Sequence, residues 1–358
     1  MPVTWMLDPT RVGSEAEMLK EKLRRRIVGQ DEAIDQIAEA YQMFLMGLRT
    51  PGRPIANFLF LGPTGSGKTR LVEATAECIA GAADAVIKVD CAEFQHSHEI
   101  AKLIGSPPGY LGHRETHPVL SQEVLNQHQT DRHKISFVLF DEIEKASDAL
   151  WNLLLGILDK GTLTLGDNRK VDFSSAMIFM TSNLGAAEMS AIATPKLGFS
   201  VCARPTDTRL DERTSKSARE AARRKFTPEF INRLDKIVVF KRLGEFELKR
   251  ILELELQLVR ERLLRSSASN AFHFTVTDSA KQLLLDEGFD SRYGARHLKR
   301  TVERLLVQPM SNLLATRQVQ AGDRLVVDSA RSRTHLVFFK ESRFSSAAGA
   351  GHENLAAA

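Results

Sequence analysis

Residues 58–69, FLFLGPTGSGKT, decide the fold expected for this chain. The four apolar residues predict a buried strand. The GPTGSGKT that follows fits the pattern G-x-x-x-x-G-K-[S/T], a glycine-rich loop between a strand and a helix. Glycines let such a loop point its amides at phosphate oxygens, and the helix N-terminus adds partial positive charge. The sequence therefore predicts a nucleotide phosphate site formed by Gly62, Pro63, Thr64, Gly65, Ser66, Gly67, Lys68 and Thr69.

The last two residues of this loop have distinct expected roles. Lys68 is expected to reach the β- and γ-phosphates of ATP, and Thr69 to offer its hydroxyl to Mg²⁺. The alternative is a glycine-rich turn without a ligand, which accounts less well for a loop flanked by a strand and a helix.

Four further apolar runs alternate with helical stretches along the chain. Unbroken apolar strands that alternate with helices predict an α/β fold, with a parallel sheet covered by helices on both faces. The runs span residues 86–89, 137–140, 177–180 and 237–240.

The pattern also predicts the division of the chain. After a lead-in at 1–16, a large domain is expected over 17–240. A smaller mixed α/β C-terminal domain is expected over 241–340, where helical stretches alternate with short strand-like segments. The tail at 341–358 is rich in small residues, and we expect it to be disordered.

Composition excludes several classes of protein. The 358 residues carry 49 basic and 45 acidic side chains, and a net charge of +4 is too small to indicate nucleic acid as the main partner. No apolar run approaches the ~20 residues that span a bilayer, so no membrane association is expected. The N-terminus lacks a signal-peptide pattern, and three scattered cysteines fit a reducing compartment. A cytoplasmic location is the expectation.

Polar residues follow two of the predicted strands and complete the candidate catalytic site. Asp141 and Glu142 end the run FVLFDE, where Asp141 is expected to hold Mg²⁺ and Glu142 to deprotonate the attacking water. Asn183 ends the run MIFMTSN and is expected to position that water. The alternatives are an acidic helix N-terminus and a turn-forming asparagine.

Five motifs, in the order in which they follow one another along the chain, resemble those of the Clp-type AAA+ ATPases. The resemblance is to the second ATPase module of ClpA, ClpB and ClpC and covers about residues 23–325. It implies a P-loop AAA+ fold and an ATP-hydrolysing, Mg²⁺-dependent chaperone or unfoldase. Such a motor threads unfolded or tagged polypeptide through the pore of a homo-oligomeric ring, usually a hexamer. The motifs are GPTGSGKT, DEIEKA, TSNLGA, FTPEFINRLD and YGARHLKR.

The resemblance also implies roles for residues outside the phosphate loop. Ile27 and Val28 resemble the segment that packs on adenine. Arg233 resembles an arginine finger that reaches the γ-phosphate bound by the neighbouring subunit, and Arg296 resembles a nucleotide-sensing arginine of the small domain. Tyr110 resembles the aromatic residue that grips substrate in the pore. Without the resemblance, these would be ordinary surface arginines and a half-buried tyrosine.

Three further features of the sequence concern the expected partners and the domain organisation. Leu197, Gly198 and Phe199 resemble a tripeptide that docks on a ClpP-like peptidase, although a hydrophobic loop anchor is the simpler interpretation. Segment 113–118, HRETHP after the pore tyrosine, is more basic than the family pattern, and its histidines lack further metal ligands nearby. Only some twenty residues precede the match, so a stand-alone single-module form is expected.

Two other classes of function remain as alternatives. One is an AAA+ motor that acts on nucleic acid, which the small net charge disfavours. The other is a nucleotide-binding scaffold that does not hydrolyse ATP. The presence of Lys68, Glu142 and Arg233 together disfavours it, because such a scaffold needs none of them.

Overall fold

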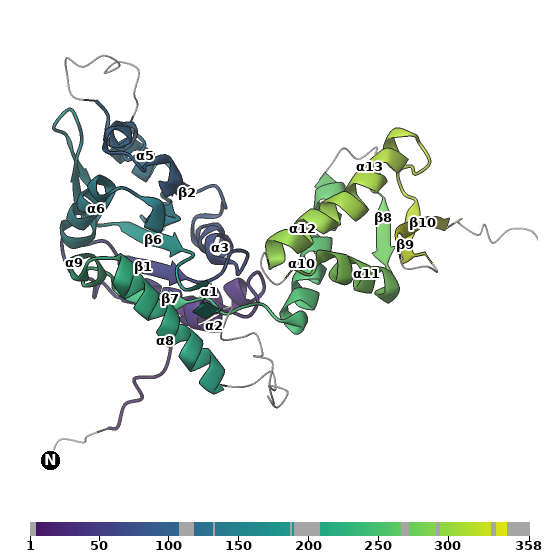
Figure 1. Ribbon diagram of the computed structural model, residues 1–358, viewed down its shortest axis with the longest axis horizontal. Helices are drawn as coiled ribbons and strands as arrows, with labels where there is room; N and C mark the ends of the chain where they lie inside the picture. The colour runs from purple at the N-terminus through teal and green to yellow at the C-terminus, as the bar shows by residue number, and fades with distance from the viewer. Residues whose placement is uncertain are drawn as a thin grey trace, which may run out of the picture. The chain divides into compact units, whose positions relative to one another are not determined.

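A computed structural model of the chain describes residues 5–106, 118–131, 133–186, 188–189, 208–265, 272–290, 294–330 and 334–341. The expectations for Tyr110, the histidines at 113 and 117, the tripeptide 197–199 and the tail from 342 lie outside the described residues. Two compact units divide the chain (Figure 1). One comprises Met1–Glu247 with Asp290–Arg296, and the other comprises Leu248–Phe289 with His297–Ala358.

A five-stranded parallel sheet forms the centre of the first unit, in the order β2-β3-β6-β1-β7. All five predicted apolar runs are strands of this sheet, which confirms the expected α/β fold. Because the strands are parallel, their carboxyl ends lie along one edge of the sheet. The strands are β1 (Ala56–Leu61), β2 (Val86–Asp90), β3 (Ser136–Asp141), β6 (Ala176–Ser182) and β7 (Lys236–Val239).

Helices cover both faces of the sheet (Figure 1). Successive side chains of a strand point to opposite faces. In β1, Phe58 and Phe60 pack in the core with the first three helices, whereas Leu59 and Leu61 pack in the core on the other face. The first group is α1 (Ser14–Arg24), α2 (Asp31–Leu45) and α3 (Lys68–Ala80); the second includes α6 (Asp148–Lys160), α8 (Thr208–Lys225) and α9 (Pro228–Ile231).

Several short elements of the first unit were not predicted. The hairpin of β4 (Thr162–Thr164) and β5 (Lys170–Asp172) buries one side chain on each strand, Leu163 and Val171, which is too little pattern to recognise. The others are η1 (Cys91–Glu93), η2 (Ser97–Ile100), α4 (Ala101–Ile104), α5 (Gln122–Asn126) and η3 (Ile143–Lys145).

The second unit has its own mixed sheet, in the order β10-β9-β8, as a smaller mixed domain requires. Strand β9 pairs in parallel with β8 and antiparallel with β10. None of the helices in the described residues is long and apolar enough to cross a membrane. The C-terminal elements are α10 (Glu245–Arg265), β8 (His273–Val276), α11 (Asp278–Gly288), α12 (Ala295–Val302), η4 (Glu303–Val307), α13 (Gln308–Ala315), β9 (Arg324–Ser329) and β10 (Leu336–Glu341).

Candidate functional site

The glycine-rich loop joins β1 to α3 in a conformation that only glycine adopts easily. Gly62, Gly65 and Gly67 have φ angles of 146°, 75° and 100°. A Cβ atom at Gly62 would lie 2.8 Å from the carbonyl oxygen of Phe240, at the end of β7. Helix α3 begins at Lys68, so its N-terminal amides face the loop. The loop therefore has the backbone geometry of an anion cradle.

Lys68 is the buried cation of this loop. Its Nζ donates hydrogen bonds to the carbonyl oxygens of Gly62 (2.7 Å) and Pro63 (3.0 Å) and to Oδ1 of Asn183 (3.0 Å). Burial lowers the pKa of Lys68 to about 8, although Asp141 and other carboxylates oppose this shift. An anion bound at the loop would stabilise the charged ammonium.

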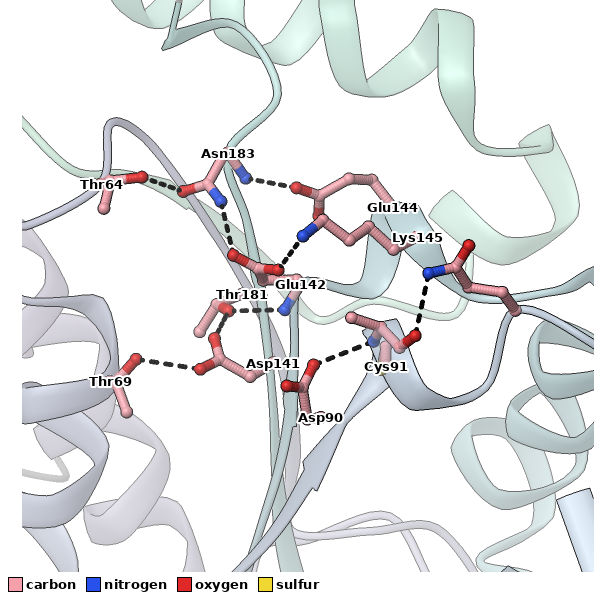
Figure 2. Close-up of polar contacts among 12 residues, drawn as sticks. Thr64, Thr69, Asp90, Cys91, Asp141, Glu142, Glu144, Lys145, Thr181 and Asn183 are labelled. Carbon is pink, nitrogen blue, oxygen red and sulfur yellow. Dashed lines mark hydrogen bonds and ion pairs between the residues drawn. The ribbon is translucent and has the colours of Figure 1, made fainter. Parts of the chain in front are cut away.

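Asp141 ends β3 beside the start of α3 (Figure 2). Its Oδ2 accepts a long hydrogen bond from the Thr69 hydroxyl (3.5 Å), and its Oδ1 accepts one from the Thr181 hydroxyl. The structure thus brings together the two residues predicted to hold Mg²⁺. Thr181 fixes the orientation of the carboxylate from the neighbouring strand.

Glu142 has a backbone conformation that is uncommon for a residue with a side chain. Its φ of 56° lies in the left-handed region, and its amide donates to Thr181 Oγ1 (3.1 Å). The carboxylate pairs with Lys145 Nζ (2.5 Å) and accepts from Asn183 Nδ2 (3.3 Å). Strained conformations of this kind persist where surrounding contacts enforce them, often at functional sites. The side chain is one-third exposed, which leaves it open to water.

Asn183 links the phosphate loop to the acidic motif (Figure 2). Its Oδ1 accepts from Lys68 and from Thr64 Oγ1 (3.3 Å), and its Nδ2 donates to Glu142. Its backbone amide donates to Glu144 Oε1 (3.0 Å). One side chain therefore contacts both the predicted phosphate-binding lysine and the predicted general base.

Sequence reasoning missed three residues that support the site. Gln30 is buried, and its side chain donates to the carbonyl oxygens of Ser66 (3.1 Å) and Lys241 (3.0 Å), which fixes the loop against the chain after β7. Glu144 and Lys145 orient Asn183 and Glu142, respectively. Only their position two and three residues after Glu142 could have singled out Glu144 and Lys145.

The other predicted nucleotide residues lie at different places in the fold. Ile27 and Val28 are buried and follow α1. Arg296 is exposed, and its positive charge contributes to the lowered pKa of Lys68. It belongs to the short segment that groups with the first unit.

The described ion pairs of Arg233 are with carboxylates of its own chain. Its guanidinium lies 3.7 Å from Asp159 and 3.3 Å from Glu229, and its side chain is one-quarter exposed. Its guanidinium also donates to the carbonyl oxygen of Glu229 (3.2 Å).

The residues of this site fit a nucleoside triphosphate with Mg²⁺. The loop presents the buried ammonium of Lys68 and the N-terminus of α3, both of which suit phosphate oxygens. Within the described residues, no group of three or more histidine, cysteine or acidic side chains forms a metal site by itself. The pair of Thr69 and Asp141 instead suits Mg²⁺, which takes few protein ligands and completes its shell with water and phosphate.

Two families match consecutive parts of the chain. The family described as "AAA domain (Cdc48 subfamily)" matches residues 53–237, and the "C-terminal, D2-small domain, of ClpB protein" matches residues 243–327. The first match contains the phosphate loop, both carboxylates, Asn183 and Arg233.

Similar proteins come from plants and bacteria. The chloroplastic chaperone protein ClpC1 of Arabidopsis thaliana is 39% identical over 316 residues, which are 87% of this chain and 32% of that protein. The chaperone protein ClpB of Rhodopirellula baltica is 35% identical over 328 residues, 92% of this chain and 34% of that protein. The chain thus spans about a third of the length of these relatives.

A solved structure agrees with the fold. A closed-state cryo-EM reconstruction of Hsp104 with ATPyS and FITC casein matches with a TM-score of 0.74 and 28% identity. The match covers 90% of this chain and 52% of the Hsp104 chain.

Proposed function

Because this chain belongs to the AAA domain family, in its Clp-type branch, we propose that it is a motor that hydrolyses ATP to remodel polypeptides. The observation that carries the proposal is the network in which Asn183 contacts Lys68 and Glu142 while Asp141 contacts Thr69. Phosphate-binding, metal-binding and proton-accepting groups then lie together at one edge of the sheet, as phosphoryl transfer to water requires.

In the proposed reaction, each residue acts on a defined atom of the substrate. Lys68 and the loop amides hold the β- and γ-phosphates, and Glu142 accepts a proton from the water that attacks the γ-phosphorus. Asn183, fixed by Glu144, orients that water. Mg²⁺ held through Thr69 and Asp141 would neutralise charge on the phosphates. The bond between the β–γ bridging oxygen and the γ-phosphorus breaks, and ADP and phosphate leave.

Arg233 completes the site of a neighbouring subunit in this proposal. An arginine supplied by another chain neutralises charge that develops on the transferred phosphoryl group. Hydrolysis therefore requires a ring, for which six subunits are expected. Ile27 and Val28 would pack on adenine, and Arg296 would respond to bound nucleotide.

The proposed substrate is an unfolded or tagged polypeptide. Support comes from the Hsp104 structure, whose description includes casein, and from the chaperone names of the sequence relatives. Tyr110 would grip the polypeptide as it is threaded through the ring, since an aromatic ring packs against many kinds of side chain.

A peptidase partner and the cellular location stay predictions. Leu197, Gly198 and Phe199 would form the contact with a ClpP-like peptidase. The sequence indicates a cytoplasmic location, but the name of the Arabidopsis relative places that protein in chloroplasts.

Unfolding of a tagged substrate tests the proposal. A stable fluorescent protein with an unstructured tail is mixed with the purified chain, and its fluorescence is followed. ATP should cause a loss of fluorescence, and a non-hydrolysable analogue should not. Unchanged fluorescence with ATP, under conditions in which ATP is hydrolysed, would contradict the proposed role in remodelling.

A further inference from the structure

A fully buried amide side chain lies in β1, an inner strand of the sheet that is otherwise apolar. Asn57 is 0% exposed and stands between Ala56 and Phe58, both buried. A buried amide without partners costs about 1–3 kcal/mol in proteins, so its hydrogen bonds determine whether the fold tolerates it. The partners of Asn57 therefore indicate what it does.

Asn57 holds the chain segment that carries Arg233. Its Nδ2 donates to the carbonyl oxygen of Arg233 (3.1 Å). Its backbone amide donates to Oδ2 of Asp235 (2.8 Å), and its carbonyl oxygen accepts from the Asp235 amide (3.0 Å). Three hydrogen bonds thus connect one residue of β1 to residues 233–235.

The second donor of the same amide reaches the residue that precedes a carboxylate partner of Arg233. Asn57 Nδ2 also donates to the carbonyl oxygen of Leu158 (3.1 Å), and Asp159, the next residue, lies 3.7 Å from the Arg233 guanidinium. One NH₂ group therefore holds the backbone of the arginine and the backbone beside its ion-pair partner. Arg53 adds a weaker hydrogen bond to the Arg233 carbonyl oxygen (3.4 Å).

We propose that Asn57 is a positioning residue for Arg233 and sets the reach of this arginine toward ATP bound by the neighbouring subunit. This inference rests on the proposed role of Arg233. The physical reason is that catalysis by a positioned group is sensitive to small displacements, and a shift of about 1 Å can cost about 100-fold in rate. Only a side chain with two donors at this position satisfies both carbonyl oxygens.

Mixed rings test the inference because they separate an effect on the neighbouring site from an effect within the altered chain. Wild-type protein is mixed one to one with subunits that carry Glu142→Gln and are therefore expected to be inactive. Three further versions of these subunits add Arg233→Ala, Asn57→Ser or the control Ser136→Ala. Ser136 is also buried on a central strand, but its hydroxyl donates to Leu125. ATP hydrolysis is measured per wild-type subunit.

The reference is the hydrolysis by mixed rings of wild-type and Glu142→Gln subunits. We expect addition of Arg233→Ala or Asn57→Ser to the inactive subunits to lower this hydrolysis about twofold, because half of the wild-type sites then face an altered arginine. The Ser136→Ala subunits should cause no additional loss. In homogeneous rings, Asn57→Ser should lower kcat about 10- to 100-fold and change KM for ATP less than about twofold.

The outcomes distinguish failure of this inference from failure of the proposed function. A loss with Arg233→Ala but not with Asn57→Ser would overturn the role of Asn57 and leave the intersubunit site intact. No loss with Arg233→Ala would overturn both. An equal loss with Ser136→Ala would show a general effect of instability and also overturn the role of Asn57.

A second variant covers the case in which Asn57→Ser does not fold. Arg53 is one-third exposed, so Arg53→Met should fold, and it removes the other donor to the Arg233 carbonyl oxygen. Arg53→Met should also lower hydrolysis at the neighbouring site, but by less than Asn57→Ser. Unchanged hydrolysis with Arg53→Met would then overturn the inference.

Discussion

The protonation of Lys68 determines how the candidate site responds to pH. The lysine is buried with its ammonium against carbonyl oxygens of the loop, and burial lowers its pKa to about 8. A bound triphosphate favours the charged form. The nucleotide and the proton should therefore bind Lys68 cooperatively.

Affinity for ATP should fall as the pH rises through about 8. Above that pH the free protein has lost the Lys68 proton, so binding must take one up, and Kd should rise by up to about tenfold per pH unit. Calorimetry from pH 7 to 10 measures both Kd and proton uptake. Lys68→Arg is the matched control, because arginine stays charged across this range. A constant Kd for the wild type would contradict the assignment.

Glu142→Gln should separate nucleotide binding from hydrolysis. The amide cannot accept the proton of the attacking water, so kcat should fall about 10²- to 10⁴-fold, as is typical for loss of a general base. Kd for ATP should change little, because Glu142 is not expected to hold the phosphates. Glu93→Gln, at an exposed carboxylate, should keep wild-type turnover. Hydrolysis by Glu142→Gln near the wild-type rate would show that another group is the base.

At the scale of elements, the phosphate loop is fixed by its contact with the end of β7. Gly62 packs against Phe240 so closely that a Cβ atom would lie 2.8 Å from its carbonyl oxygen and 3.0 Å from its Cβ. Gly81, which ends α3, also has a positive φ (85°), but a Cβ atom there would meet nothing within 4 Å. Substitution of these two glycines by alanine therefore distinguishes the cost of a steric contact from the cost of backbone strain.

Gly62→Ala should destabilise the protein by about 2–4 kcal/mol, from strain and overpacking together. Gly81→Ala should cost about 1 kcal/mol, from strain alone. Urea unfolding of both variants, with the free energies compared, checks this. Equal losses would show that the contact with Phe240 has no energetic effect.

The sequence was most informative where burial is continuous along an element. The three inner strands β1, β3 and β6 follow from unbroken apolar runs, because inner strands covered on both faces bury nearly every side chain. The β4–β5 hairpin buries one side chain per strand and was not recognisable. Single polar residues such as Gln30 and Asn57 show no pattern, since their partners lie 36 to 211 residues away along the chain.

At the scale of the whole molecule, the proposed motor requires several copies of the chain and a polypeptide. Asn183 contacts both Lys68 and Glu142 within one chain, whereas Arg233 pairs with Asp159 and Glu229. The contacts within one chain cannot include a contact between an arginine and a γ-phosphate that another subunit binds. For this reason the resemblance to a family, rather than spacing, was needed to single out Arg233.

Tyr110→Ala should uncouple hydrolysis from substrate processing. The residue is expected to grip polypeptide and not to contact ATP, so basal hydrolysis should stay within about twofold, while stimulation by polypeptide is lost. Tyr110→Phe keeps the ring and should keep stimulation. Full stimulation of the alanine variant by an unstructured polypeptide would remove Tyr110 from the proposed mechanism.

The most direct measurement is steady-state ATP hydrolysis by the purified protein, alone, with an unstructured polypeptide such as casein, and with DNA. A polypeptide-remodelling motor predicts stimulation by the polypeptide and none by DNA. Stimulation by DNA alone would contradict the proposed function and favour a motor that acts on nucleic acid. Absence of hydrolysis under all three conditions would favour a nucleotide-binding scaffold.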